Sequence, residues 1–192
     1  MQELKDRIMA EGRVLPGNII KVDGFLNHRI DTELMTHIAD EFGRHFNMDE
    51  VTMILTAEAS GIALSAIVAQ RFHKPMLFAK KAKSDNIEGG LYQSDIFSYT
   101  YKKKVTLLVA KDWISADDKV LIIDDFMANG EAIRGLCDIV KAAGATLVGV
   151  GCAVEKGFQG GGDRLRVAGV NLKSLAIIES AQPGQIVFRD EM

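Results

Sequence analysis

The carboxylates of Asp124 and Asp125 stand side by side directly after the apolar run VLII, residues 120–123. A structural corner between a strand and a helix does not need two negative charges beside a hydrophobic layer. Carboxylates accept hydrogen bonds from hydroxyl groups, and they can hold Mg²⁺, whose ligands are oxygen atoms. The pair therefore indicates a binding site, and the structural alternative is a strand that ends in a solvated acidic corner.

A turn of small residues follows the acidic pair and leads into a helical pattern. Ala128, Gly130 and Ala132 let backbone N–H groups approach a ligand closely, while Asn129 is suited to an unusual backbone angle or to a helix cap. The start of a helix presents unpaired N–H donors and a partial positive charge, which favour a phosphate. A phosphate on one side and hydroxyls on the other outline a ribose 5-phosphate.

Short and nearly all-apolar runs must position these residues, and they occupy residues 53–57, 75–79, 120–124 and 147–155. Such runs are typical of parallel strands that are buried on both faces. Helical patterns follow the first and third runs, and Gly144 is placed to end the later helix. This alternation predicts an α/β fold, with a central and mostly parallel sheet flanked by helices. Ligands of such folds bind at the carboxyl ends of the strands, where the acidic pair is expected.

Other segments depart from this alternation. Residues 83–104 open with a polar, glycine-containing stretch and continue as QSDIFSYTYKKK, which predicts a loop and a short antiparallel arm. The N-terminal helix and GFLNHRID, residues 24–31, are expected to form a small cap. SLAIIES and QIVFRD are expected to add edge strands. The length of 192 residues suits one domain, residues 1–192.

The composition excludes several classes of protein. A hydrophobic content of 47% and a charged content of 26% are ordinary for a soluble globular protein, and the net charge of −3 argues against a general nucleic-acid binder. No apolar run approaches the ~20 residues of a membrane helix, and the N-terminus is no signal peptide. Cys137 and Cys152 lack metal-type spacing and favour free thiols. We therefore expect a cytoplasmic protein without a nucleic-acid or membrane partner.

The apolar run, acidic pair and small-residue turn together resemble the phosphoribosyl-pyrophosphate signature of the type I phosphoribosyltransferase family. GFLNHRID, AEASGI, VLIIDDFMANGEA and EKGFQGG, in this order, are similar to segments of the xanthine-using bacterial members, and the likeness covers essentially the whole chain. The resemblance implies the type I phosphoribosyltransferase fold with a small hood and a mobile loop arm. Residues 1–33 and the C-terminal strands would contribute to the base-binding hood, and residues 83–104 would form the flexible arm.

The resemblance also implies an activity. Members of the family transfer ribose 5-phosphate from 5-phospho-α-D-ribose 1-diphosphate (PRPP) to a purine nitrogen and release pyrophosphate, with Mg²⁺ as a helper. For this chain the implied reaction converts xanthine to xanthosine 5′-monophosphate (XMP) in purine salvage, and the implied assembly is a homodimer. Two alternatives stay open: a PRPP-binding transcriptional regulator without turnover, and a guanine or hypoxanthine phosphoribosyltransferase.

Carried over to this sequence, the resemblance assigns roles to the residues of the central motif. Asp124 and Asp125 would be catalytic, because they would bind the ribose hydroxyls, directly or through Mg²⁺, and would suit an oxocarbenium-like sugar. The 5-phosphate would be held by Ala128, Asn129, Gly130, Glu131 and Ala132.

The same resemblance assigns the two remaining parts of the site. Pyrophosphate would be bound by Ser60, Gly61, Lys80 and Lys81, although each lysine alone could equally be a solvated surface charge. Xanthine would be bound by Ile20, Asn27, Lys156 and Phe158. Among these, Asn27 would read the 2-oxo group that hypoxanthine lacks, which disfavours the guanine or hypoxanthine alternative.

The sequence departs from hypoxanthine–guanine enzymes at one position. Those enzymes carry a further acid three residues after the second acid of the pair, where this chain has Ala128. The motif therefore supplies no general base, and we expect the acidic xanthine to react as an anion.

Overall fold

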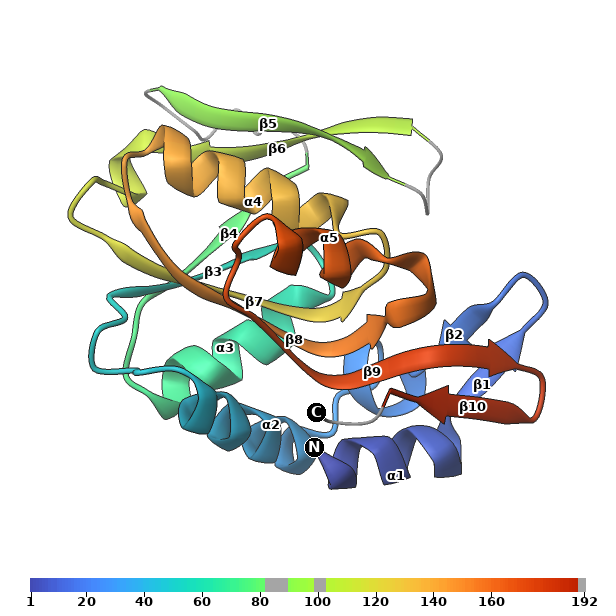
Figure 1. Ribbon diagram of the computed structural model, residues 1–192. Coiled ribbons are helices and arrows are strands. Elements are labelled where there is room, and N and C mark those ends of the chain that lie inside the picture. The colour runs from blue at the N-terminus through green and yellow to red at the C-terminus, as the bar shows by residue number, and fades with distance from the viewer. Residues whose placement is uncertain (82–89, 99–102, 190–192) are drawn as a thin grey trace.

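The computed structural model of the chain describes residues 1–81, 90–98 and 103–189 (Figure 1). A six-stranded sheet lies at the centre, with the order β10-β9-β8-β7-β3-β4. The strands from β9 to β4 run parallel, and β10 runs antiparallel to β9 at one edge. The strands are β3 (Met53–Ala57), β4 (Met76–Ala79), β7 (Lys119–Met127), β8 (Thr146–Lys156), β9 (Leu172–Gln182) and β10 (Gln185–Phe188). The predicted α/β fold with a mostly parallel sheet is confirmed.

The C-terminal strands differ from the prediction in one respect. Both were expected at an edge, but β9 lies inside the sheet between β8 and β10. It takes this place because its first part pairs with β8, from Leu172 to Ile178, while its later part pairs with β10. Only β10 forms the edge.

Helices cover both faces of the sheet, with α1, α2 and α3 on one face and α4 and α5 on the other (Figure 1). Leu34, Ile38 and Phe42 of α2 recur at helical spacing and are buried in the core under the first face, and Ile133 and Leu136 of α4 are buried under the second. The helices are α1 (Gln2–Glu11), α2 (Thr32–His45), α3 (Gly61–Arg71), α4 (Glu131–Ala142) and α5 (Gly161–Val167). None of the helices in the described ranges is long and apolar enough to cross a membrane.

The N-terminal segment forms a small unit beside the sheet. After α1 comes an antiparallel hairpin of β1 (Arg13–Leu15) and β2 (Ile19–Lys21), and then a π-helical turn, η1 (Asp23–Asn27). Phe25 and Leu26 of this turn are fully or almost fully buried in the core. The turn therefore holds the segment predicted as a cap against the main body of the protein.

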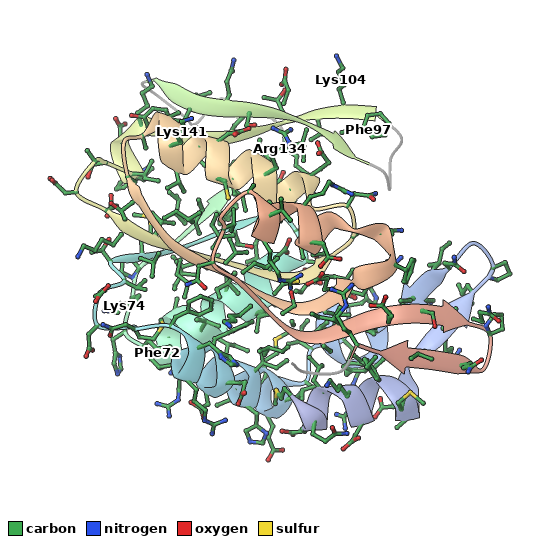
Figure 2. All side chains as sticks on the ribbon, viewed as in Figure 1. Phe72, Lys74, Phe97, Lys104, Arg134 and Lys141 are labelled. Atoms are coloured by element: carbon green, nitrogen blue, oxygen red, sulfur yellow. The ribbon has the colours of Figure 1, made fainter. Side chains whose placement is uncertain are left out.

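The predicted arm appears as an antiparallel pair, β5 (Leu91–Ser98) and β6 (Lys103–Ala110), which extends further than expected. The pair lies over α4, where Gly135 allows a close approach, since an added Cβ would stand 2.5 Å from Ile96 Cγ2. Arg134 of α4 reaches the arm, and its Nη2 donates to the backbone oxygen of Asp95 at 2.7 Å (Figure 2). The predictions for residues 83–89 and 99–102 lie outside the described residues.

Strand β7 also runs further than predicted, and this changes the position of the acidic pair. The expected end was residue 124, but pairing with β8 continues from Asp124 opposite Cys152 to Met127 opposite Glu155. Asp124 and Asp125 therefore lie inside the strand and not in a corner that follows it.

Candidate active site

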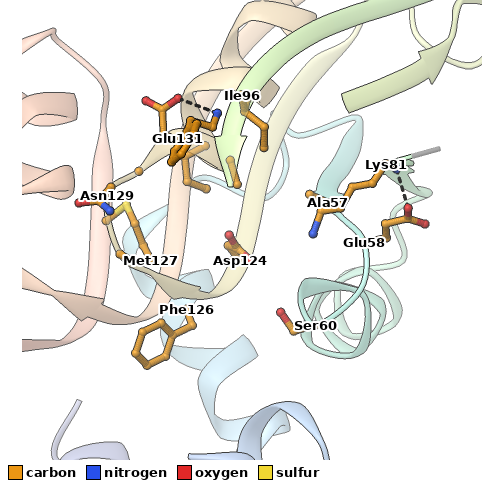
Figure 3. A pocket seen from close by; sticks show the side chains of 15 residues that line it. Ala57, Glu58, Ser60, Lys81, Ile96, Asp124, Phe126, Met127, Asn129 and Glu131 are labelled. Atoms are coloured by element: carbon orange, nitrogen blue, oxygen red, sulfur yellow. Dashed lines mark hydrogen bonds between the residues drawn. The ribbon is translucent and has the colours of Figure 1, made fainter. Parts of the chain in front are cut away.

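A cavity of about 200 Å³ lies at the carboxyl ends of β3 and β7 (Figure 3). Its walls join segments that are far apart in the sequence: Ser60, Lys81, Asp124 and the whole turn of residues 128–132. Ile96 and Phe97 of the arm are also part of the lining, and sequence reasoning did not single them out. The cavity thus gathers the predicted phosphate turn, one acid of the pair and part of the predicted pyrophosphate site.

The turn of residues 128–132 leads directly into α4. Gly130 is the residue before the helix and has a φ of +78°, a left-handed conformation that favours glycine. Asn129 was expected to take the unusual angle or to cap the helix, and this was wrong, because Gly130 takes the angle and no side chain caps the helix. The first N–H groups of α4 have no acceptor within the helix and are directed to its N-terminal end, beside the cavity.

A second segment that is rich in glycine packs directly against this turn. Gly160 has a φ of +68°, and Gly161 packs so closely that an added Cβ would stand 2.4 Å from Ala128 O and 2.5 Å from Asn129 C. Arg164 Nη2 also donates to Asn129 O at 3.2 Å. The EKGFQGG segment therefore shapes the phosphate turn. The run of three glycines was the signal in the sequence that could have indicated this close packing.

Gly161→Ala should test this packing. The added methyl group would displace the backbone of the turn, so we expect the KM for PRPP to rise about tenfold or more, while the KM for xanthine changes little. Steady-state kinetics with each substrate varied would measure both values. Gly24→Ala is the matched control, because an added Cβ at Gly24 meets no atom within 4 Å. An unchanged KM for PRPP in Gly161→Ala would contradict the expectation.

The two acids occupy different environments. Asp124 lines the cavity and is 8% exposed. Burial, and then the negative charge of Asp125, raise the pKa of the Asp124 carboxyl well above its ordinary value. Asp125 is fully buried, and its two oxygens accept hydrogen bonds from Ser60 Oγ at 2.7 Å and Asn27 Nδ2 at 2.9 Å. The structure therefore brings Asp124 to the cavity and engages Asp125 with other side chains.

The predicted pyrophosphate residues are divided in a similar way. Ser60 and Lys81 line the cavity, and Gly61 lies beside it, where an added Cβ would stand 2.2 Å from Thr56 Oγ1 and 2.9 Å from Asp124 Oδ1. Lys80 is not part of this lining, and its backbone pairs with that of Leu108 in the arm. Thr56 Oγ1 is buried and has no hydrogen-bond partner among the described residues, so it offers an unused polar atom close to Asp124.

The predicted base-binding residues gather next to the cavity without lining it. Lys156 Nζ donates to Asn18 O at 3.1 Å and lies 5.5 Å from the ring centroid of Phe126, which does line the cavity. Burial lowers the pKa of the Lys156 ammonium. Ile20 is 7% exposed, and Phe158 and Phe126 pack against the same hydrophobic cluster. Phe126 is a further candidate for base binding that sequence reasoning missed.

A buried ion pair supports the strand that carries Lys156. Glu155 is fully buried, and its carboxylate accepts hydrogen bonds from Arg166 Nη2 at 2.6 Å and Nη1 at 3.0 Å and from Ser174 Oγ. Arg166 Nη1 also contacts Asp163 at 3.2 Å, which in turn accepts from Arg189. The ion pair links β8, α5 and β9. A charged residue at the end of the apolar run LVGVGCAVE was its signal in the sequence.

The donor atoms of the site fit a Mg²⁺ ion that binds together with a phosphorylated ligand. Within the described residues, no group of three or more histidine, cysteine, aspartate or glutamate side chains is arranged to hold a metal. Asp124 presents one carboxylate to the cavity, whereas the oxygens of Asp125 are already engaged. Mg²⁺ is commonly held by one or two carboxylates, substrate phosphates and water. Asp124 is therefore the candidate protein ligand.

Comparisons with known proteins agree with this architecture. The family model of the phosphoribosyl transferase domain matches residues 25–168. The chain is 51% identical to the xanthine phosphoribosyltransferase of Bifidobacterium longum (strain NCC 2705) over 192 residues, which cover 98% of this chain and 100% of the relative. It is also 51% identical to the xanthine phosphoribosyltransferase of Lachnoclostridium phytofermentans over 193 residues, which cover 100% of both chains.

Solved structures resemble the fold. The adenine phosphoribosyltransferase of Rhodothermus marinus matches with a TM-score of 0.74 and 20% identity, over 93% of this chain and 100% of that one. The adenine phosphoribosyltransferase of Trypanosoma brucei, in complex with AMP, pyrophosphate and ribose-5-phosphate, matches with a TM-score of 0.72 and 23% identity, over 91% of this chain and 79% of that one. At these identities the likeness concerns the fold alone.

Proposed function

The chain belongs to the phosphoribosyltransferase family, and we propose on this basis that it transfers ribose 5-phosphate from PRPP to xanthine, giving XMP and pyrophosphate. The observation that carries the proposal is the cavity in which Asp124, the turn of residues 128–132 and the turn at Ser60 meet. The choice of xanthine rests on the full-length relatives that carry this name at about half identity.

The cavity supplies the contacts that the donor requires. In the proposal, the backbone N–H groups of residues 128–132 and the start of α4 hold the 5-phosphate, because unpaired donors and the helix dipole favour an anion there. Ser60, Gly61 and Lys81 receive the pyrophosphate group, with Lys81 compensating the charge of the leaving anion. Lys80 also belongs to the proposed pyrophosphate-binding residues, although it pairs with Leu108 of the arm and does not line the cavity.

Asp124 has the central chemical role in the proposal. As the bond to pyrophosphate breaks, positive charge develops on the sugar, and a carboxylate in a site shielded from water stabilises it strongly. Burial makes this carboxylate costly to ionise in the free protein. The charge of Lys81 already offsets part of this cost in the free protein, and the cationic sugar would offset a further part once the donor is bound.

In the proposal, polar side chains that hydrogen-bond to the purine, together with apolar side chains, place the purine beside this sugar. Lys156 donates to a purine carbonyl or N7, Asn27 reads the 2-oxo edge, and Ile20, Phe126 and Phe158 supply apolar contacts. All three apolar residues belong to one hydrophobic core region, with Ile20 buried in it and Phe126 and Phe158 packed against it. Asp124 would hold a Mg²⁺ ion that enters with PRPP, and the ion would supply positive charge to neutralise the donor diphosphate.

Assembly, location and domain organisation are parts of the same proposal. We propose a homodimer, which light scattering after size-exclusion chromatography would test. We propose a cytoplasmic location, and the free thiols of Cys137 and Cys152 agree with a reducing compartment. We treat residues 1–192 as a single phosphoribosyltransferase domain, with the N-terminal unit as the hood over the base.

A spectrophotometric assay with Mg²⁺ and PRPP tests the activity directly. Xanthine, hypoxanthine, guanine and adenine are offered separately, and we expect nucleotide to form fastest from xanthine. Faster turnover of guanine or hypoxanthine would assign the chain to another purine. Tight binding of PRPP without turnover of any purine would instead identify a regulator that uses PRPP as an effector.

A further inference from the structure

The carboxylate of Asp125 joins two functional segments that are remote in the sequence. It lies in β7 and is fully buried, and it does not line the cavity. Its Oδ1 accepts from Ser60 Oγ at 2.7 Å, next to the pyrophosphate turn, and its Oδ2 accepts from Asn27 Nδ2 at 2.9 Å, at the end of η1. Each oxygen thus has a side-chain partner from a different part of the site.

The chemistry of this contact sets the orientation of the Asn27 amide. An ionised carboxylate only accepts hydrogen bonds, so it can pair with the NH₂ group of Asn27 but not with its carbonyl oxygen. Once Nδ2 faces Asp125, the amide retains its carbonyl oxygen and one more N–H for a ligand. These two groups form a donor and acceptor pair that is complementary to an O=C–N–H edge of a purine.

Xanthine carries such an edge at its 2-oxo group, whereas hypoxanthine has a C–H at that position. An amide turned by 180° would place its oxygen against the 2-oxo group and its N–H against the ring N–H, and both contacts would be unfavourable. A site that pairs a polar group discriminates against ligands that leave it unpaired. The preference therefore depends on the group that keeps the amide in one orientation.

We propose that Asp125 is a positioning residue for purine preference, which acts by orienting Asn27 and by tying that side chain to Ser60 of the pyrophosphate turn. This inference rests on the proposed transfer to xanthine. It assigns Asp125 a role distinct from that of Asp124, although the two are adjacent in the sequence. Asp125 would therefore influence the purine preference through Asn27 rather than by contacting the purine itself.

The test is a double-mutant cycle read out as the ratio of kcat/KM for xanthine to kcat/KM for hypoxanthine. Asp125→Asn keeps the shape of the side chain but can present an NH₂ group to Asn27, so we expect the ratio to fall about tenfold. In an Asn27→Ala background, the same Asp125→Asn change should leave the ratio unaltered. Asp124→Asn is the matched control, because it should lower turnover with both purines by the same factor.

Ser60→Ala provides a second route if Asp125→Asn does not fold, as judged by circular dichroism and thermal denaturation. It frees one oxygen of Asp125 without changing the buried carboxylate, and we expect a ratio about threefold lower, again only when Asn27 is present. The positioning role would be overturned if these variants lowered kcat/KM by the same factor for xanthine and hypoxanthine, both with Asn27 present and in the Asn27→Ala background. A wild-type protein that turns over no purine would instead overturn the proposed function, so the two failures are distinguishable.

Discussion

Asp124→Asn is expected to lower kcat for XMP formation by about 10²- to 10³-fold, which is the usual effect of removing one preorganised electrostatic contact to a transition state. Asp124 is the acid that lines the cavity, and it is 8% exposed. The neutral amide keeps the size of the side chain but removes the charge that stabilises the developing sugar cation. The KM for xanthine should change much less than kcat.

The same substitution is expected to raise thermal stability at neutral pH. Burial raises the pKa of Asp124 above its ordinary value, so the folded protein binds a proton more tightly than the unfolded chain. Below the unfolded pKa of about 3.9 the group is protonated in both states and costs nothing. As the pH rises through that value and up to the folded pKa, the native state loses stability, and above the folded pKa the loss is complete.

Thermal denaturation between about pH 4 and pH 8 measures this effect. The Tm of Asp124→Asn should exceed that of the wild type, and the difference should grow with pH before it becomes constant. Asp117→Asn is the control, because Asp117 is an exposed acid far from the cavity lining. Its kcat and its Tm should equal those of the wild type across this pH range. A variant that keeps full turnover would remove Asp124 from the chemical step.

Arg166→Met is expected to lower the free energy of unfolding by about 3–5 kcal/mol, because it leaves a buried carboxylate without its cation. Glu155 is fully buried, and Arg166 contacts both of its oxygens, at 2.6 Å and 3.0 Å. Methionine is shorter than arginine, but its flexible apolar side chain can occupy the space of the arginine stem, so the unpaired charge should account for most of the loss.

Urea denaturation of three variants measures this contribution. Arg164→Met is the matched control on the same helix. Arg164 is exposed, and its observed hydrogen bonds go to the backbone oxygens of Gln159 and Asn129. This variant should lower the free energy of unfolding by no more than about 1 kcal/mol. Glu155→Met combined with Arg166→Met removes both charges and should recover most of the stability. A double variant as unstable as Arg166→Met would show that the charge is not the cause.

Local patterns in the sequence were sufficient for the main elements of the fold. The apolar run of residues 53–57 is β3 as predicted, and the helical patterns after it and after the phosphate turn are α3 and α4. Gly144 follows α4 with a φ of +73°, as expected for a residue that ends a helix. These features depend on neighbours within a few residues, where periodicity, small residues and glycine carry the information.

The family resemblance added what local patterns could not, namely the roles of residues such as Asn27 and Lys156. Neither residue has a distinctive local signature, because an asparagine in a turn and a lysine at a strand end are both common. Their roles remain predictions, and the variants of Asn27 described above test one of them directly.

The sequence by itself determined the alternation of strands and helices, the acidic pair and the small-residue turn, because these are properties of short segments. Only the tertiary structure decided how the pair is used. Pairing with β8 extends β7 to Met127 and so places both acids inside a strand, where only Asp124 lines the cavity. The contacts of Asp125 with Ser60 and Asn27 span 65 and 98 residues of sequence. Such contacts arise from packing between elements, which no local periodicity encodes.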